Sequence, residues 1–236
     1  MLEEIFAISN YPDLDQKQTF STKLSTLLKT YGILLLAIFL AVPVMLVADK
    51  LVTNVFHHKS LASANKFALH AMFHKLGFLK SFLLACIVAP VFEEVICRLP
   101  LSFKKRDIAI GLSIAAFYFS GAFFHPANIL VKLGIEAAIA VIIAGLCFKF
   151  IPATVVLISP ANKKRWIIFF ISFFGLMHIL NFHPIDYFLI WIYPVFVIPQ
   201  LLMGWGMSYI RFKNGFVWGI ALHMLINTVT VLLTFH

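Results

Sequence analysis

Long apolar segments restrict the fold of this chain more than any other feature. Hydrophobic residues make up 61% of its 236 residues and charged residues only 12%, against about half and about a quarter in soluble domains. A bilayer core of about 30 Å needs about 20 residues of apolar helix, and helices satisfy their own backbone hydrogen bonds in lipid. We therefore predict an all-α, polytopic integral membrane protein with seven transmembrane helices, at 31–47, 81–101, 108–124, 135–150, 166–182, 187–210 and 215–235.

Two further regions flank or interrupt these spans. Residues 61–78 are apolar but contain Lys66 and Lys75 as well as two histidines, which favours a helix lying along the membrane interface; as a short span it would make an eighth transmembrane helix. Residues 1–30 are polar and contain no apolar stretch typical of a signal peptide. We expect a polar N-terminal segment at 1–30, followed by one transmembrane helical domain at 31–236.

The distribution of charge predicts the orientation in the membrane. The net charge is +9, and basic clusters at 104–106, 163–165 and 211–213 fall on the same side of the predicted spans. The positive-inside rule makes that side cytoplasmic, which places the chain in the cell membrane as a multi-pass protein with its N-terminal segment inside. Because these charges flank membrane spans and form no single surface stripe, the bilayer is the expected partner and nucleic acid is not.

One predicted span carries an unusual group of charges, formed by Glu93, Glu94 and Arg98. A charge at membrane depth is costly unless it is paired, and marks a functional site by default. On a helix Glu94 and Arg98 share a face at a spacing that favours an ion pair, whereas Glu93 points elsewhere and becomes the candidate proton acceptor. The alternative is that all three form a buried structural network, as ion pairs in transporters do.

Two later spans contain the polar residues that could meet Glu93. His178 follows Phe174 by one helical turn, so that the phenyl ring can form a wall of the site, and His223 and Asn227 share a face at i, i+4. Both members of the second pair can donate hydrogen bonds to an oxyanion. The alternatives are a core histidine bonded to a backbone carbonyl and polar contacts between helices.

Counting along continuous helices places these residues at similar depth. At 1.5 Å per residue from the nearest basic cluster, Glu93 lies about 16 Å, His178 about 20 Å and His223 about 15 Å into the membrane. The three levels agree within a helical turn, which supports a common site.

A carboxylate, two imidazoles and an amide near the middle of a membrane fit base-activated attack of water on a carbonyl, which is peptide-bond hydrolysis. Other protease chemistries lack their residues: the chain contains no HExxH motif, no aspartate in the middle of a predicted span and no serine in a GxSG context. Cys97 shares a face with Glu93, but a neighbouring carboxylate disfavours the thiolate nucleophile. Cys86, Cys97 and Cys147 all fall in predicted spans, which argues against a disulfide framework.

Three motifs in order give the chain a resemblance to a known family. The sequences Glu93-Glu94-Val-Ile-Cys-Arg98, Phe174-Gly-Leu-Met-His178 and His223-Met-Leu-Ile-Asn227 resemble the EExxxR, FxxxH and HxxxN motifs of the CPBP (CAAX-processing and bacteriocin-processing, or ABI) intramembrane endopeptidases. The resemblance covers about 84–230, the predicted catalytic core. It implies that Glu93 and His178 activate water, that His223 and Asn227 form the oxyanion hole, and that the Glu94–Arg98 pair holds the helix.

The resemblance also implies a membrane-associated peptide or protein substrate and an active site that opens toward the cytoplasm. A metal-free mechanism is favoured, because Asn227 is a poor zinc ligand and a good oxyanion donor; if zinc is bound instead, Glu93, His178 and His223 would hold it. Two other functions stay open: a non-catalytic membrane scaffold or bacteriocin-immunity protein of the same family, and a small transporter with a buried ion-pair relay.

Overall fold

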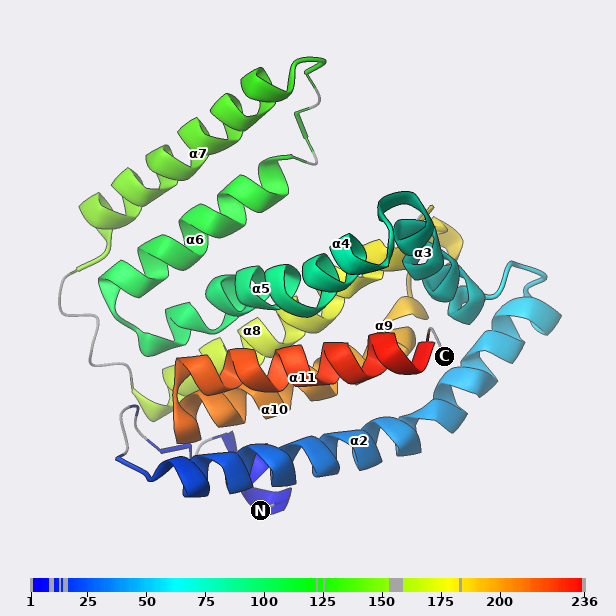
Figure 1. The fold of residues 1–236 in the computed structure, drawn as a ribbon, viewed down its shortest axis with the longest axis horizontal. Helices are drawn as coiled ribbons and strands as arrows, with labels where there is room; N and C mark the ends of the chain where they lie inside the picture. The colour runs from blue at the N-terminus through cyan, green and yellow to red at the C-terminus, as the bar shows by residue number, and fades with distance from the viewer. Residues whose placement is uncertain are drawn as a thin grey trace. The chain divides into compact units, whose positions relative to one another are not determined.

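The computed structural model describes residues 2–8, 11–12, 14, 17–121, 123–124, 126–152, 159–182 and 184–234. These residues form helices and no strand (Figure 1). The α-helices are α1 (Leu2–Phe6), α2 (Phe20–Lys50), α3 (Leu61–Leu76), α4 (Phe78–Leu83), α5 (Ala89–Cys97), α6 (Lys105–Ser120), α7 (Ile129–Phe150), α8 (Pro160–Met177), α9 (Tyr193–Phe196), α10 (Ile198–Asn214) and α11 (Phe216–Thr234). Short π-helices η2 (Leu51–Val55) and η3 (Leu84–Val88) and 3₁₀ helices η4 (Leu99–Ser102), η5 (His178–Phe182) and η6 (Tyr187–Leu189) connect or extend them.

Four helices among the described residues are long and apolar enough to cross a membrane: Phe20–Val55, Ile129–Phe150, Pro160–Phe182 and Phe216–Thr234. They contain the predicted spans 31–47, 135–150 and 166–182, and almost all of 215–235. The described residues are thus all-helical, with four helices that suggest a membrane protein, and the number of seven or eight spans stays a prediction. The first of these helices starts at Phe20, inside the segment 1–30 that we expected to be polar and separate.

The predicted span 187–210 is not one helix. It is divided into η6, α9 and α10, and α9 and α10 each have a proline, Pro194 and Pro199, in their first turn. Proline has no amide hydrogen and its ring clashes with the preceding turn, so it fits the start of a helix and interrupts its interior. The apolar pattern alone did not take account of these two prolines.

The predicted spans 81–101 and 108–124 also differ from expectation. The chain is helical from Phe78 to Cys97 through α4, η3 and α5, and then changes to the 3₁₀ helix η4. The depth of Glu93 was counted along a continuous helix to Lys104, so that value does not hold, whereas α8 is continuous between Arg165 and Met177. In place of the predicted span 108–124 the structure has helix α6, which starts at Lys105 and ends at Ser120; its 16 residues form about 24 Å of helix.

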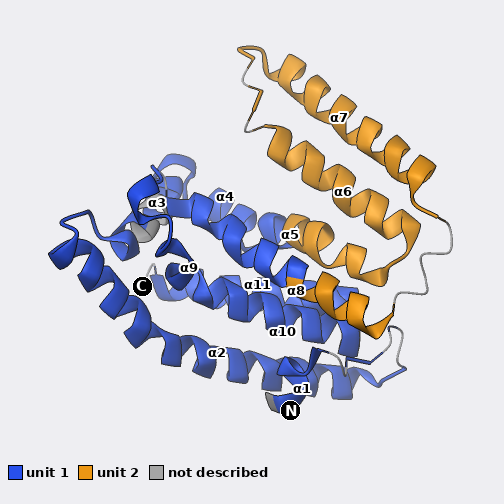
Figure 2. Cartoon of the chain, turned by 180° about the vertical axis from the view of Figure 1, so that it is seen from behind, with its two compact units in different colours: residues 1–90, 169–236 blue, residues 91–168 orange. Residues whose placement is uncertain are grey.

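The chain divides into two compact units, residues 1–90 with 169–236 and residues 91–168 (Figure 2). The divisions fall inside α5 and α8. The first unit contains α1 to η3, the C-terminal half of α8, and all that follows; the second contains most of α5, η4, α6, α7 and the start of α8.

Close helix packing in the first unit depends on two glycines. A Cβ atom on Gly206 of α10 would lie 2.5 Å from Leu34 Cδ1 of α2, and one on Gly175 of α8 would lie 2.4 Å from Leu201 Cδ2 of α10. The Leu34 and Leu201 side chains fill the space that a side chain at each glycine would occupy. Helices α2 and α8 can therefore pack closely on α10. A buried cluster at the far ends of these helices closes the unit; it contains Ala48, Val52, Leu61, Phe182, Leu189, Ile192, Tyr193, Phe196 and Val197.

The second unit is built on the pair α6 and α7, which lie side by side (Figure 1). Gly111 of α6 lets Pro100 of η4 approach, since a Cβ atom there would lie 2.5 Å from the proline Cγ. On α7, Lys132 Nζ lies 3.8 Å from Glu136 Oε1. The packing of η4 on α6 fixes the turn that follows α5, the helix of the EExxxR motif.

Candidate active site

The second unit contains the EExxxR motif at the end of α5. Arg98 Nη1 lies 3.1 Å from Glu94 Oε1, and both side chains have an exposed fraction of 0%. The i, i+4 spacing predicts this ion pair, and the backbone supports it, because the Arg98 amide donates to the Glu94 carbonyl at 2.8 Å. A buried pair of opposite charges keeps each charge compensated away from water.

Glu93 precedes this pair and lies about 100° around the helix from Glu94. Its side chain is half-buried, and its carboxylate interacts electrostatically with Tyr118 of α6. The two acids therefore have different surroundings within one unit: Glu94 pairs with Arg98, and Glu93 interacts electrostatically with Tyr118. We did not single out Tyr118 from the sequence. The only signal there was its hydroxyl group, in the second half of the apolar segment 108–124.

The first unit brings together the FxxxH motif of α8 and the HxxxN motif of α11. The Phe174 and His178 rings have centroids 4.8 Å apart, and the Phe174 and His223 rings 5.5 Å apart at an interplanar angle of 83°. Phe174 is fully buried and His223 is 1% exposed, whereas His178 is half-buried. We call Phe174, His178 and His223 the histidine cluster. Phe174 forms a wall for both imidazoles, where the sequence predicted a wall for one.

A hydrogen bond within the histidine cluster fixes the tautomer of His178. Its Nδ1 lies 2.7 Å from the Phe174 carbonyl oxygen. Because a carbonyl oxygen only accepts hydrogen bonds, Nδ1 must carry the proton, and in the neutral ring the lone pair is then on Nε2. The bond forms at the residue where α8 tightens into the 3₁₀ helix η5. His178 can therefore accept a proton, or bind a metal ion, through Nε2.

Asn227 is held by a different part of the first unit. Its Nδ2 donates to the Ala85 carbonyl oxygen at 2.9 Å, which ties α11 to η3, the π-helix directly before α5. In a π-helix this carbonyl would accept from the amide five residues later, but residue 90 is proline and has no N–H, so the carbonyl is left for the Asn227 side chain. An amide nitrogen carries two hydrogens, and one remains for another acceptor.

Gly175 determines how the part of α8 that bears the histidine cluster packs on α10. It lies between Phe174 and His178 in the sequence, and its missing side chain lets α8 pack on Leu201 of α10. The face of α8 that bears Phe174 and His178 is set by this contact. Because the backbone nitrogen of Leu201 would also lie 3.2 Å from an added Cβ, even alanine would force the two helices to shift.

The structure thus groups the predicted residues by unit: Glu93, Glu94 and Arg98 in one, and Phe174, His178, His223 and Asn227 in the other. In the described parts of the chain, no three His, Cys, Asp or Glu side chains are placed to hold a metal ion together. All three cysteines are free. No protein-family model, no curated protein and no solved structure matches this chain.

Proposed function

We propose that this chain is an intramembrane endopeptidase of the CPBP type. The observation that carries the proposal is the histidine cluster: two imidazoles from motifs 45 positions apart in the sequence, at 178 and 223, pack on one buried phenyl ring. Core histidines on separate helices have no reason to share a wall, whereas two histidines that act on one substrate bond do.

In the proposed mechanism Glu93 and His178 activate a water molecule that attacks the peptide carbonyl. His178 is prepared for this role, because its Nδ1–H donates to Phe174 and leaves Nε2 as the base. The developing oxyanion would be held by His223 and by the second hydrogen of the Asn227 amide. The Glu94–Arg98 pair takes no part in the reaction and keeps the end of α5 folded.

The substrate we propose is a peptide or protein segment held at the membrane, and the site would open toward the cytoplasmic side. Zinc remains an alternative to the metal-free mechanism: the tautomer of His178 suits a metal ligand whose other nitrogen is held by a carbonyl. Bound zinc would polarise the carbonyl and acidify the water. The metal-free mechanism is favoured, because Asn227 is better suited to donate than to bind zinc.

The decisive experiment replaces Glu93 by glutamine, which keeps the shape of the side chain and removes its basicity. Purified protein in lipid nanodiscs would be given quenched fluorogenic peptides anchored to the membrane by a prenyl or an acyl group. We expect Glu93→Gln to lower kcat about 10³-fold or more, since positioned acid–base groups contribute about 10² to 10⁴, with an unchanged melting temperature. The control Glu3→Gln, an exposed acid outside the motifs, should cleave like the wild type. Full activity of Glu93→Gln would reject the mechanism.

One observation favours a second candidate function, a non-catalytic scaffold or immunity protein. Asn227 already bonds the Ala85 carbonyl, which is what a residue that joins two helices does. A scaffold would keep its cellular phenotype in Glu93→Ala and His178→Ala and lose it in Arg98→Ala together with expression. Cleavage that depends on Glu93 excludes this alternative.

A further inference from the structure

A pocket rich in lysine lies in the first unit, away from the histidine cluster. It has a volume of about 460 Å³ and lies between the start of α2 and the end of α10; Lys17, Gln18, Lys23, Phe212, Lys213, Asn214 and Gly215 line it. Lys17 and Lys23 have no acidic partner among the residues that the structure describes, and Lys213 Nζ lies 3.8 Å from Glu4 Oε2. Three cations face one described acid at this pocket.

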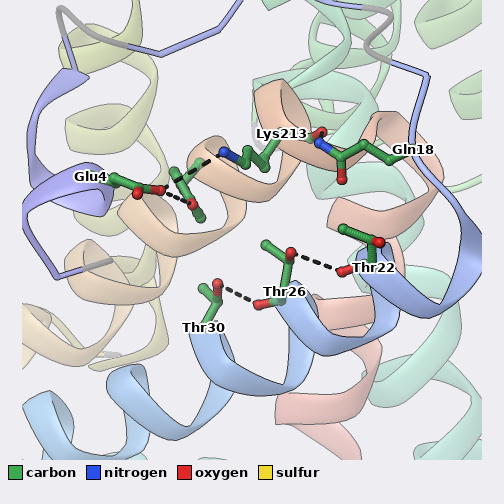
Figure 3. A network of polar contacts seen from close by, with 7 residues as sticks. Glu4, Gln18, Thr22, Thr26, Thr30 and Lys213 are labelled. Carbon is green, nitrogen blue, oxygen red and sulfur yellow. Dashed lines mark hydrogen bonds and ion pairs between the residues drawn. The ribbon is translucent and has the colours of Figure 1, made fainter.

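Two amide side chains hold the walls of this lysine pocket in place. Gln18 Nε2 donates to the Lys213 carbonyl at 3.2 Å, and Asn214 Nδ2 donates to the Lys23 carbonyl at 2.8 Å. Figure 3 shows Gln18 and Lys213 beside the first turns of α2, with Glu4 on the other side of Lys213. The bonds run in both directions between the two chain segments, so the lysine backbones are fixed before any ligand binds.

The neighbouring helices place this pocket at the level of a membrane interface. Gly215 lines it, and α11, one of the helices long and apolar enough to cross a membrane, starts at the next residue. The rings of Phe20 and Trp218, next to these residues in the sequence, contact each other in a tilted arrangement with centroids 5.3 Å apart. Tryptophan and other aromatic rings, together with lysine, concentrate where the hydrocarbon core meets the headgroups.

An exposed apolar stripe leads away from the pocket along α2. Phe20, Leu24 and Leu28 are spaced four residues apart, so they lie on one face of the helix, and their exposed fractions are 71%, 39% and 52%. The stripe starts three residues after Lys17 and passes Lys23. A positive pocket at the head of an apolar stripe matches a phospholipid, with a phosphate at one end and acyl chains at the other, better than a free anion.

We propose that the lysine pocket binds the phosphate of one anionic phospholipid, whose acyl chain lies along Phe20, Leu24 and Leu28. Anionic headgroups are attracted to basic residues at the membrane surface, and Lys17 and Lys23, which have no acidic partner among the described residues, supply the selectivity over zwitterionic lipids. The site is separate from the proposed peptidase site and does not depend on it.

The test is native mass spectrometry of the full chain released from micelles that contain equal amounts of phosphatidylglycerol and phosphatidylcholine with the same acyl chains. We expect one phosphatidylglycerol to be retained in preference. In Lys17→Ala/Lys23→Ala its affinity should fall roughly thirty-fold, about five-fold for each lysine. The matched control Lys50→Ala/Lys80→Ala removes the same charge from exposed lysines elsewhere in the unit and should bind like the wild type.

Further variants and competing ligands test what the pocket binds and whether the protein remains folded. The charge-preserving Lys17→Arg/Lys23→Arg should retain the lipid, and every variant should keep the melting temperature of the wild type, because these lysines make no described ion pair. Equal loss in the control pair, or equal retention of phosphatidylcholine, would overturn the proposal. Displacement by inorganic phosphate as complete as that by excess phosphatidylglycerol would assign the pocket to a soluble anion and reject the lipid.

Discussion

The two motif-bearing regions of this molecule hold polar groups inside apolar helices by opposite means. At the end of α5, Glu94 and Arg98 compensate each other's charge and are fully buried. In the histidine cluster, two imidazoles pack on one phenyl ring, and His178 remains partly accessible. The difference separates support from chemistry: the ion pair is fully buried, so a substrate cannot reach it, whereas His178 is partly accessible.

The largest effect that would sharpen this comparison is expected from Arg98→Ala. The substitution leaves the Glu94 carboxylate buried without its partner, which costs about 3 to 5 kcal/mol in free energy of unfolding. Thermal melts in detergent and the yield of folded protein would measure it. The control Arg165→Ala, an exposed arginine of α8, should melt like the wild type. Glu94→Gln/Arg98→Met removes both charges and should recover part of the loss. An Arg98→Ala protein as stable as the control would contradict a supporting role.

The reverse outcome is expected for His178→Gln. We predict that kcat falls about 10²- to 10³-fold, as for the loss of a positioned base, with a melting temperature close to that of the wild type. The same fluorogenic peptides serve as substrate, and His74→Gln, an exposed histidine of α3, is the control. In addition, ¹⁵N spectra of the wild type should show the Nδ1–H tautomer at His178 at neutral pH. A spectrum showing Nε2–H would mean that the ring does not donate to Phe174.

Asn227→Ala tests a residue with two candidate roles, one structural and one catalytic. Asn227 bonds a backbone carbonyl and is also proposed as an oxyanion donor. We expect kcat to fall about 10²-fold at unchanged KM, with a loss of about 1 kcal/mol in stability from the missing hydrogen bond. Thr230→Val, which removes a hydroxyl bonded within α11, is the control. A loss of stability without any loss of kcat would assign Asn227 to the scaffold alone.

The smallest effect concerns the N-terminal helix α1. The Tyr209 hydroxyl donates to Glu4 Oε2 at 2.9 Å, and this bond, followed by the charge of Lys213, holds the pKa of Glu4 below its usual value. A lowered folded pKa stabilises the docked state above the unfolded pKa, and this contribution is lost as the pH falls through the folded pKa. The protection factor of the Ala7 amide, which bonds the Glu3 carbonyl, should therefore fall on acidification once the exchange rate is corrected for its intrinsic pH dependence. Glu4→Gln should flatten this dependence and Glu3→Gln should not.

The sequence predicted the all-helical class, but it predicted seven spans where four described helices are long and apolar enough to cross a membrane, and it missed the interruptions. Apolar runs indicate where a helix can cross a bilayer, and four described helices fit that prediction. The same runs do not show where a helix tightens or stops: Pro194 and Pro199 divide one predicted span, and 3₁₀ geometry after Cys97 ends another. These breaks depend on backbone hydrogen bonding, to which hydropathy is insensitive.

For the candidate site, helical spacing predicted contacts within a helix and missed those between helices. The Glu94–Arg98 pair follows from i, i+4 geometry. The packing of His223 on Phe174 and the bond from Asn227 to Ala85 join segments far apart in the chain, and they depend on how whole helices pack against one another. Without contacts between helices, the sequence favoured Asn227 as an oxyanion donor and left a polar contact between helices as the alternative.

The shared wall at Phe174 has a consequence for how this protein can evolve. One ring orients two imidazoles, so a smaller residue at 174 would release both at once and a single substitution would act like a double one. Among descendants of this sequence, substitutions at positions 174, 178 and 223 should therefore occur together.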